Sequence, residues 1–260
     1  MYNKNFLTDV FLRYDYSASQ PDLQDTINKE FRAVILEKFP IMEEKESIEK
    51  QVQFSMDQKD SVVVNEKKFK EWIFWDINRK NCLQINTNSI VFVIKSYTKF
   101  SDLREIYMTI LSETEKYYPA IKFKRIGLRY VDQIELDNKR SVNKWYDFWK
   151  KYINLKLLKG IEFCENELQS GLTRQMNLIE TNYGIFNVRF QYGIFNSDYP
   201  ALNKKKVFVL DTDVYATGIF EYGECDQHII EFHQKAKSYF EKSIRGNLKT
   251  IMGSDNGAED

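Results

Sequence analysis

The 260-residue sequence has few of the residues that the commonest cofactor enzymes and secreted proteins depend on. It contains 10 glycines, 4 prolines, 3 cysteines and 2 histidines. No two glycines form a G-x-G pattern, so the glycine-rich loops that cradle phosphates in dinucleotide and P-loop sites are absent. We therefore expect no cofactor of these kinds, and the commonest nucleotide-dependent enzymes are excluded.

The sequence also lacks net charge and long apolar runs. Lys and Arg total 38, as do Asp and Glu, so the uniform basic field typical of unspecific nucleic-acid binders is missing. A nucleic-acid partner is not expected, although a neutral total does not exclude a local basic patch. No apolar segment approaches the ~18 residues of a membrane span, and the first residues do not resemble a signal peptide. The odd, widely spaced cysteines indicate reduced thiols. These features favour a cytoplasmic protein without a membrane partner.

Aromatic residues are abundant, at 15% of the chain, and predict an aromatic-rich core. Apolar residues at helical spacing predict helices after Pro21 as far as Phe39, from Ser101 to Pro119, over 145–152, and over about 226–251. Alternation of apolar and polar residues predicts the strands, which are 6–16, 52–56, two or three within 70–97, 121–136, 158–167, 172–180, 185–195 and 206–217.

This pattern predicts an α+β fold with mostly antiparallel sheets and long helices packed on them. The order of elements suggests two halves of repeated layout within one compact unit. We expect an N-terminal α+β half over 1–152, and a C-terminal half over 153–252 made of four strands and a long helix. The small, acidic residues 253–260 are expected to form a disordered tail.

The strand over 121–136 carries the most distinctive polar face. A phase change near Lys124 and Arg125 predicts a bulge. The polar side chains share one side of the strand, and they are Arg125, Arg129, Gln133 and Glu135. Two guanidinium groups about 14 Å apart on one face could bind carboxylate or phosphate groups bidentately. If a helix covers that face, the arginines are instead structural ion-pair donors, and the sequence leaves both interpretations open.

Asp211 and Asp213 form a second polar pair. Two residues apart on a strand, they point to the same face with Cα atoms about 7 Å apart. Such a pair could hold Mg²⁺ or act as acid and base if two or more further carboxylates converged on it. Polar residues on the solvent side of an ordinary strand would produce the same pattern.

The histidines offer little for catalysis or metal binding. His228 and His233 are five residues apart, about 140° around a helix, rather than the spacing of four that places two ligands on one face. Cys225 and His228 are a weak candidate metal pair at a helix start. No G-x-S-x-G motif marks a nucleophile. We expect neither catalytic residues nor a metal site, and the balance of the sequence is against an enzyme.

Several short segments resemble a known family. They are 127–134 (GLRYVDQI), 209–215 (VLDTDVY) and 239–244 (YFEKSI), together with the strand pair around 83–97. They resemble a sporadically distributed family of prokaryotic proteins of about 250 residues and unknown function. Such a resemblance implies a mobile-element, toxin–antitoxin or phage-defence context, and it assigns no functional residue.

Three functional hypotheses follow. The first is a non-catalytic cytoplasmic binding protein that acts through a protein partner in a toxin–antitoxin or phage-defence setting. The second is a small-molecule or nucleotide-binding protein with an anion pocket between the halves, in which Arg125 and Arg129 hold the anion. The third is a metal-dependent hydrolase that uses Asp211 and Asp213. A homo-oligomer is compatible with each.

Overall fold

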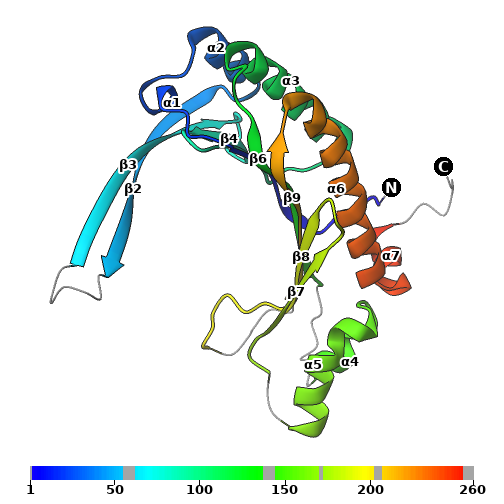
Figure 1. Cartoon of the computed structure of the whole chain (residues 1–260). Coiled ribbons are helices and arrows are strands. Elements are labelled where there is room, and N and C mark those ends of the chain that lie inside the picture. The colour runs from blue at the N-terminus through cyan, green and yellow to red at the C-terminus, as the bar shows by residue number, and fades with distance from the viewer. Residues whose placement is uncertain (1, 55–61, 137–143, 170–171, 202–206, 254–260) are drawn as a thin grey trace. The chain divides into compact units, whose positions relative to one another are not determined.

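The structure is a computed structural model, and it describes residues 2–54, 62–136, 144–169, 172–201 and 207–253 (Figure 1). Its strands form one sheet in the order β2-β3-β4-β5-β1-β6-β9-β8-β7. The strands are β1 (Leu7–Tyr16), β2 (Ile41–Phe54), β3 (Val62–Trp75), β4 (Asn81–Asn86), β5 (Ser89–Ile94), β6 (Phe123–Glu135), β7 (Gln175–Asn182), β8 (Asn187–Ile194) and β9 (Val207–Phe220). The predicted α+β class with an antiparallel sheet is confirmed.

The helices among the described residues are α1 (Asp22–Asp25), α2 (Lys29–Lys38), α3 (Phe100–Tyr117), α4 (Trp145–Trp149), α5 (Lys159–Glu162), α6 (Tyr222–Ser243) and α7 (Gly246–Met252). A 3₁₀ turn η1 (Leu155–Leu158) and a π-type turn η2 (Phe163–Glu167) flank α5. None of these helices is both long and apolar enough to cross a membrane.

The chain forms two compact units, each assembled from segments that are distant in sequence. The first unit contains Met1–Val10, Gly127–Ala216 and His228–Asp260, and the second contains Phe11–Ile126 and Thr217–Gln227. The division into halves 1–152 and 153–252 stays a prediction. Of the predicted tail 253–260, all but Gly253 lies outside the described residues.

In the second unit, β2 to β5 form an antiparallel meander. The predicted helix from Pro21 to Phe39 is wrong in one respect, because it is divided into α1 and α2. The break occurs where Thr26 adopts an extended backbone and the Asn28 side chain accepts the N–H of Phe31 at 3.0 Å. Asn28 thus caps α2, and this local hydrogen bond competes with continuation of the helix from α1.

The predicted phase change at the start of β6 agrees with the burial pattern. Phe123 and Ile126 are three residues apart, yet both are fully buried. Strict alternation would place them on opposite faces of the strand. After this point Leu128, Tyr130 and Ile134 are buried, and they alternate with the polar side chains that were predicted to share the other side of the strand.

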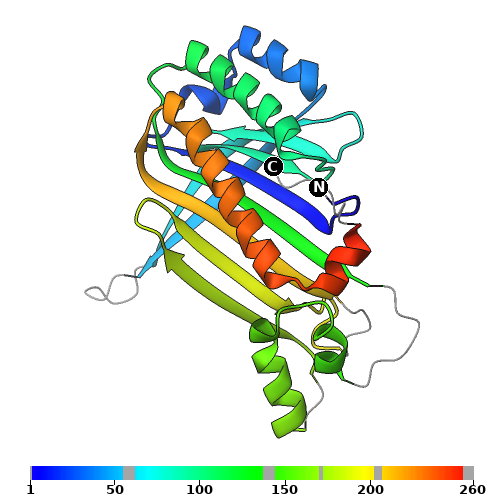
Figure 2. The same cartoon turned by 90° about the vertical axis from the view of Figure 1, so that its right-hand side faces the viewer.

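In the first unit, β7, β8 and β9 are antiparallel neighbours, and α6 runs across one face of the strands (Figure 2). Aromatic contacts join α6 to the sheet, since Phe232 packs on Phe186 and Tyr239 packs on Phe190. The fully buried Trp149, the last residue of α4, packs on Phe208 of β9. One face of these strands is therefore committed to the core.

The predicted strand over 158–167 is wrong, because this segment consists of helical turns. Leu158 and Ile161 are fully buried at helical spacing, and Glu165 follows on the same side. The Glu165 carboxylate accepts the backbone N–H groups of Trp145 and Tyr146 at 2.8 and 3.0 Å. It thereby supplies acceptors for the free N–H groups in the first turn of α4. Alternation of residue types along the chain does not reveal this contact.

The predicted closing helix over 226–251 is divided as well, into α6 and α7. Ile244 pairs with Ile153 in an isolated β-bridge, and the Arg245 N–H donates to the Tyr152 carbonyl at 2.8 Å. The interruption shifts the helical phase. Ile251, the last residue of the predicted helix, is 42% exposed, while Met252 is buried.

Gly193 allows a test of the β7–β8 pairing. Its φ is +148°, and a Cβ atom there would lie 2.0 Å from the Gln175 carbonyl oxygen. We expect Gly193→Ala to lower the free energy of unfolding by at least about 3 kcal/mol, through clash and backbone strain. The control is Gly223→Ala in α6, where nothing lies within 4 Å of the new atom. It should be neutral or gain up to about 1 kcal/mol. Urea denaturation measures both, and equal stabilities would contradict the pairing.

Candidate functional site

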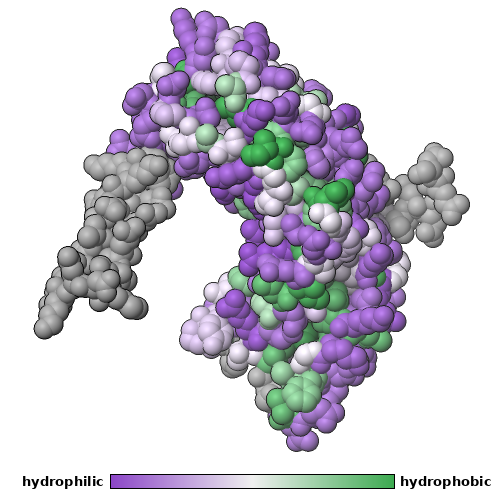
Figure 3. Space-filling model, in the orientation of Figure 1, coloured by the Kyte–Doolittle hydropathy of each residue, from purple (hydrophilic) through white to green (hydrophobic). Residues whose placement is uncertain are grey.

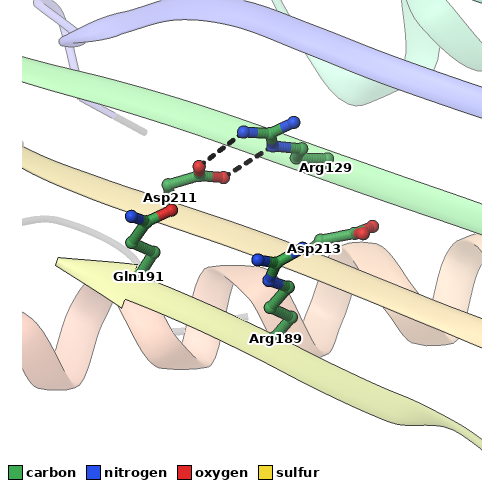
Figure 4. Close-up of a pocket in the computed structure, with 5 residues that line it drawn as sticks. All are labelled: Arg129, Arg189, Gln191, Asp211 and Asp213. Carbon is green, nitrogen blue, oxygen red and sulfur yellow. Dashed lines mark hydrogen bonds and ion pairs between the residues drawn. The ribbon is translucent and has the colours of Figure 1, made fainter. Parts of the chain in front are cut away.

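The candidate site lies on the face of the first unit's strands that points away from α6. Phe190 packs on Tyr239 of α6, and the Thr181 hydroxyl lies 3.0 Å from the Tyr239 hydroxyl. Because side chains alternate along a strand, Arg189 and Gln191 must point to the opposite face. Figure 4 shows them there, with the α6 ribbon behind the strands.

A small cavity of about 110 Å³ opens on this face. Its lining side chains come from three neighbouring strands, and they are Arg129, Arg189, Gln191, Asp211 and Asp213 (Figure 4). The register of β8 and β9 places Gln191 opposite Asp211 and Arg189 opposite Asp213. The cavity is therefore built from side chains of regular antiparallel strands.

A bidentate ion pair between Arg129 and Asp211 forms the centre of this cavity. Arg129 Nε donates to Asp211 Oδ1 at 2.8 Å, and Nη2 donates to Oδ2 at 2.6 Å. The Asp211 side chain is 11% exposed and the Arg129 side chain 46%. The hydrogen bond to Asp211 raises the pKa of Arg129, and the charges of Asp213 and Asp9 add to this. The carboxylate thus holds a half-exposed guanidinium in a defined orientation.

The neighbouring row of the sheet also alternates in charge. Arg189 Nε lies 3.7 Å from Glu180 Oε1 on β7, and Asp213 stands opposite Arg189 on β9. The charges along this row are therefore negative at Asp213 on β9, positive at Arg189 on β8 and negative at Glu180 on β7. A face of this kind suits recognition of mixed polar groups better than binding of a simple anion.

Asp132 is a buried acid close to this network. Its side chain occupies a position on β6 with the same parity as the buried Tyr130 and Ile134. Burial, with a contribution from the Asp211 charge, raises the pKa of Asp132 to about 8. The carboxyl group is therefore mostly protonated at neutral pH.

The structure brings together three of the predicted site residues, Arg129, Asp211 and Asp213. Arg125, Gln133 and Glu135 do not line the cavity.

The cavity also contains Arg189 and Gln191, which were not predicted as site residues. Alternation within the predicted strand 185–195 already placed them on one face, but the register between β8 and β9 was needed to bring them to the aspartates. Asp132 had a clearer signal, since it interrupts the apolar face of β6.

No group of three or more histidine, cysteine or acidic side chains that could hold a metal ion occurs among the described residues. Cys225 is fully buried, its thiol lies 3.4 Å from the Glu221 carbonyl oxygen, and burial raises its pKa to about 12. The His228 ring packs on Phe232. Burial, with the Lys237 charge, lowers the pKa of His233 to about 4. The weak candidate metal pair of Cys225 and His228 receives no support from these surroundings.

No family model, curated protein or solved structure matches this chain. The resemblance to the sporadic prokaryotic family therefore stays a prediction.

The buried Asp132 predicts an unusual dependence of stability on pH. Unfolded aspartate loses its proton near pH 4, whereas the folded protein keeps it until about pH 8. The folded state thus binds the extra proton, and the free energy of unfolding should fall between these values by up to about 1.4 kcal/mol per pH unit. Asp132→Asn should remove this slope and raise stability at pH 7. Urea denaturation at pH 5, 6, 7 and 8 measures it, and parallel profiles for the two proteins would refute the assignment.

The ion pair at the centre of the cavity can be tested by a double-mutant cycle. Because Asp211 is buried and the contact is bidentate, Arg129→Gln and Asp211→Asn should show a coupling of about 1 kcal/mol. The exposed pair Asp147 and Lys150, at 2.6 Å within one helical turn, is the matched control and should couple more weakly. Additive effects of the Arg129 and Asp211 variants would contradict the proposed orientation of the guanidinium group.

Proposed function

We propose that this chain is a non-catalytic binding protein that acts through a protein partner, and that the partner adds an extended segment to the outer edge of β7. The observation that carries the proposal is the exposure of consecutive apolar residues in the terminal strand of the sheet.

β7 is the last strand in the sheet order, and β8 is its neighbour. Leu178 is 49% exposed and Ile179 41%, and the next residue, Glu180, is exposed too. Consecutive side chains point to opposite faces of a strand. Both faces of β7 are thus in contact with solvent at its centre, where the backbone can pair with another strand.

The other terminal strand, β2, is protected in a way that β7 is not. Its sequence, IMEEKESIEKQVQF, is rich in charged residues, whereas QMNLIETN of β7 contains a single one, Glu180. Charged side chains on an edge strand are a common defence against strand addition. The apolar centre of β7 is consistent with an edge that is kept available for pairing.

The surface beside β7 has the anatomy of a protein interface. Register places Leu178 opposite Gln191 and Glu180 opposite Arg189, so the apolar strand continues directly into the charged cavity of Arg129 and Asp211. Hydrophobic side chains interrupt the mainly hydrophilic surface in this part of the sheet (Figure 3). An apolar centre bordered by ordered charges is typical of specific protein interfaces.

An extended polypeptide is the occupant that this edge fits. Backbone hydrogen bonds of an added strand would supply affinity, while side-chain contacts with Leu178, Ile179 and the charged row would supply specificity. The resemblance of the sequence to the sporadic prokaryotic family suggests a partner in a toxin–antitoxin or phage-defence system. The acid–base balance of the cavity supports binding rather than hydrolysis as the role of Asp211 and Asp213.

The test starts from a partner purified with the chain from its native host and reconstituted as a binary complex from purified components. We expect Leu178→Lys and Ile179→Lys each to raise the dissociation constant at least about tenfold, because each removes an apolar contact and adds an edge charge. Ile77→Lys is the control, since Ile77 is 73% exposed in the β3–β4 turn. Calorimetric titration measures all three.

Hydrogen exchange of the same complex supplies an independent measurement. Binding should slow exchange of those β7 amides whose N–H groups point away from β8, because they become hydrogen-bonded, whereas the alternate amides already face β8. A purified complex with unchanged β7 exchange, and with equal affinity for the three lysine variants, would show that the partner binds elsewhere. Failure to isolate any stoichiometric partner would count against the function itself.

A further inference from the structure

A second cavity in the first unit has a chemistry different from that of the β-sheet face. Its volume is about 420 Å³, within the ~300–1,000 Å³ that is typical of small-molecule pockets. It is lined by residues around α4 and at the junction of α6 and α7, which are Tyr146, Lys150, Lys151, Leu155, Arg245, Gly246 and Asn247.

The walls of this cavity are held together by backbone contacts. The Arg245 N–H donates to the Tyr152 carbonyl, and the Asn154 N–H donates to the Ser243 carbonyl, each at 2.8 Å. Between them, Ile153 and Ile244 form a β-bridge and are both buried. The Arg245 guanidinium also donates to the Lys150 carbonyl. The two segments are therefore joined before any ligand arrives, which reduces the entropic cost of binding.

The charge of the lining is entirely of one sign. Among the described residues that line the cavity, Lys150, Lys151 and Arg245 carry charge and none is acidic. Lys150 binds Asp147 at 2.6 Å, whereas neither Lys151 nor Arg245 forms an ion pair with an acid in the part of the chain that the structure describes. The pKa of Asp147 is lowered by its hydrogen bond to Lys150 and then by the charges of Lys150, Lys144 and Lys151. Positive potential thus accumulates here in a chain without net charge.

We propose that this cavity binds a phosphate-bearing small molecule, with Lys151 and Arg245 as the groups that hold the phosphate. The planar guanidinium of Arg245 offers paired donors to phosphate oxygens, and the lysine ammonium adds a point charge. Tyr146 and Leu155 supply an apolar wall for the remainder of the ligand. A side-chain hydrogen bond to Glu162 raises the pKa of Tyr146. The Tyr146 hydroxyl is therefore already hydrogen-bonded to that acid.

The local geometry favours a compact anion over a nucleic-acid backbone. A polyanion is normally bound along an extended basic stripe, and the whole chain has as many acids as bases. Two acids stand close to the cavity without lining it, because Asp147 pairs with Lys150 and Glu162 pairs with Lys159 at 2.8 Å.

The experiment is a calorimetric titration of the whole chain with pyrophosphate, ATP and AMP at low salt, with a single-stranded oligonucleotide in parallel. We expect saturable binding of at least one of the three phosphate compounds, weakening as salt is raised, because exposed charges are screened. Lys151→Gln and Arg245→Gln should each weaken it about tenfold, since each removes one charge-assisted contact.

Lys156→Gln is the matched control, because Lys156 is exposed, lies on η1 and does not line the cavity. Thermal unfolding of each variant separates lost binding from lost folding, which matters for Arg245 because it contacts the Lys150 carbonyl. No binding at millimolar concentrations, or equal affinity in the Lys151 and Lys156 variants, would overturn the site. Preference for the oligonucleotide, lost in the same variants, would replace the small molecule with a nucleic-acid backbone.

Discussion

Burial of one face of β8 and β9 beneath α6 is the constraint on which the rest of the first unit depends. Phe190 contacts Tyr239, so the residues between the buried positions are forced to the opposite side. There the register places Arg189 opposite Asp213 and Gln191 opposite Asp211. The same alternation leaves Leu178 and Ile179 on opposite faces of the terminal strand. Packing on one side of the sheet thus decides which chemistry is presented on the other.

Charge in this network is ordered at some cost to stability. Asp211 is buried and compensated by the bidentate Arg129, which keeps a guanidinium in place at the surface. Asp132 is buried without comparable compensation, and its pKa rises to about 8. A carboxyl group kept protonated in the core is unfavourable as pH rises. On the open face, Arg129 pairs with Asp211 and Arg189 with Glu180, an arrangement that supports the proposed binding role.

The two proposed sites differ in the kind of partner that their chemistry selects. The β7 edge provides backbone groups and apolar side chains, which fit an extended polypeptide. The cavity of Lys151 and Arg245 is lined by cations, and it fits a compact anion. Neither site requires the glycine-rich loops or clustered histidines that the sequence lacks. A neutral total charge is compatible with both sites. Acids and bases are equal in number in the cavity beside β7, whereas cations are in excess in the cavity of Lys151 and Arg245.

Residue types and their spacing were sufficient to predict the α+β class, the strands on either side of the Asn86–Ser89 turn, helix α3 and the polar face that contains Arg129. They also predicted the Asp211 and Asp213 pair, because alternation is a local property of the chain. They did not predict the breaks at Asn28 and Ile244, or the helical turns over 158–167. The helical turns and the break at Ile244 depend on Glu165 capping α4 and on Ile153 pairing with Ile244, which are contacts between distant residues. The break at Asn28 depends on a local cap that competes with continuation of the helix. The partners of Arg129, and the union of Lys151 with Arg245, were likewise decided by tertiary structure alone, since strand register and helix junctions bring together groups that the sequence keeps apart.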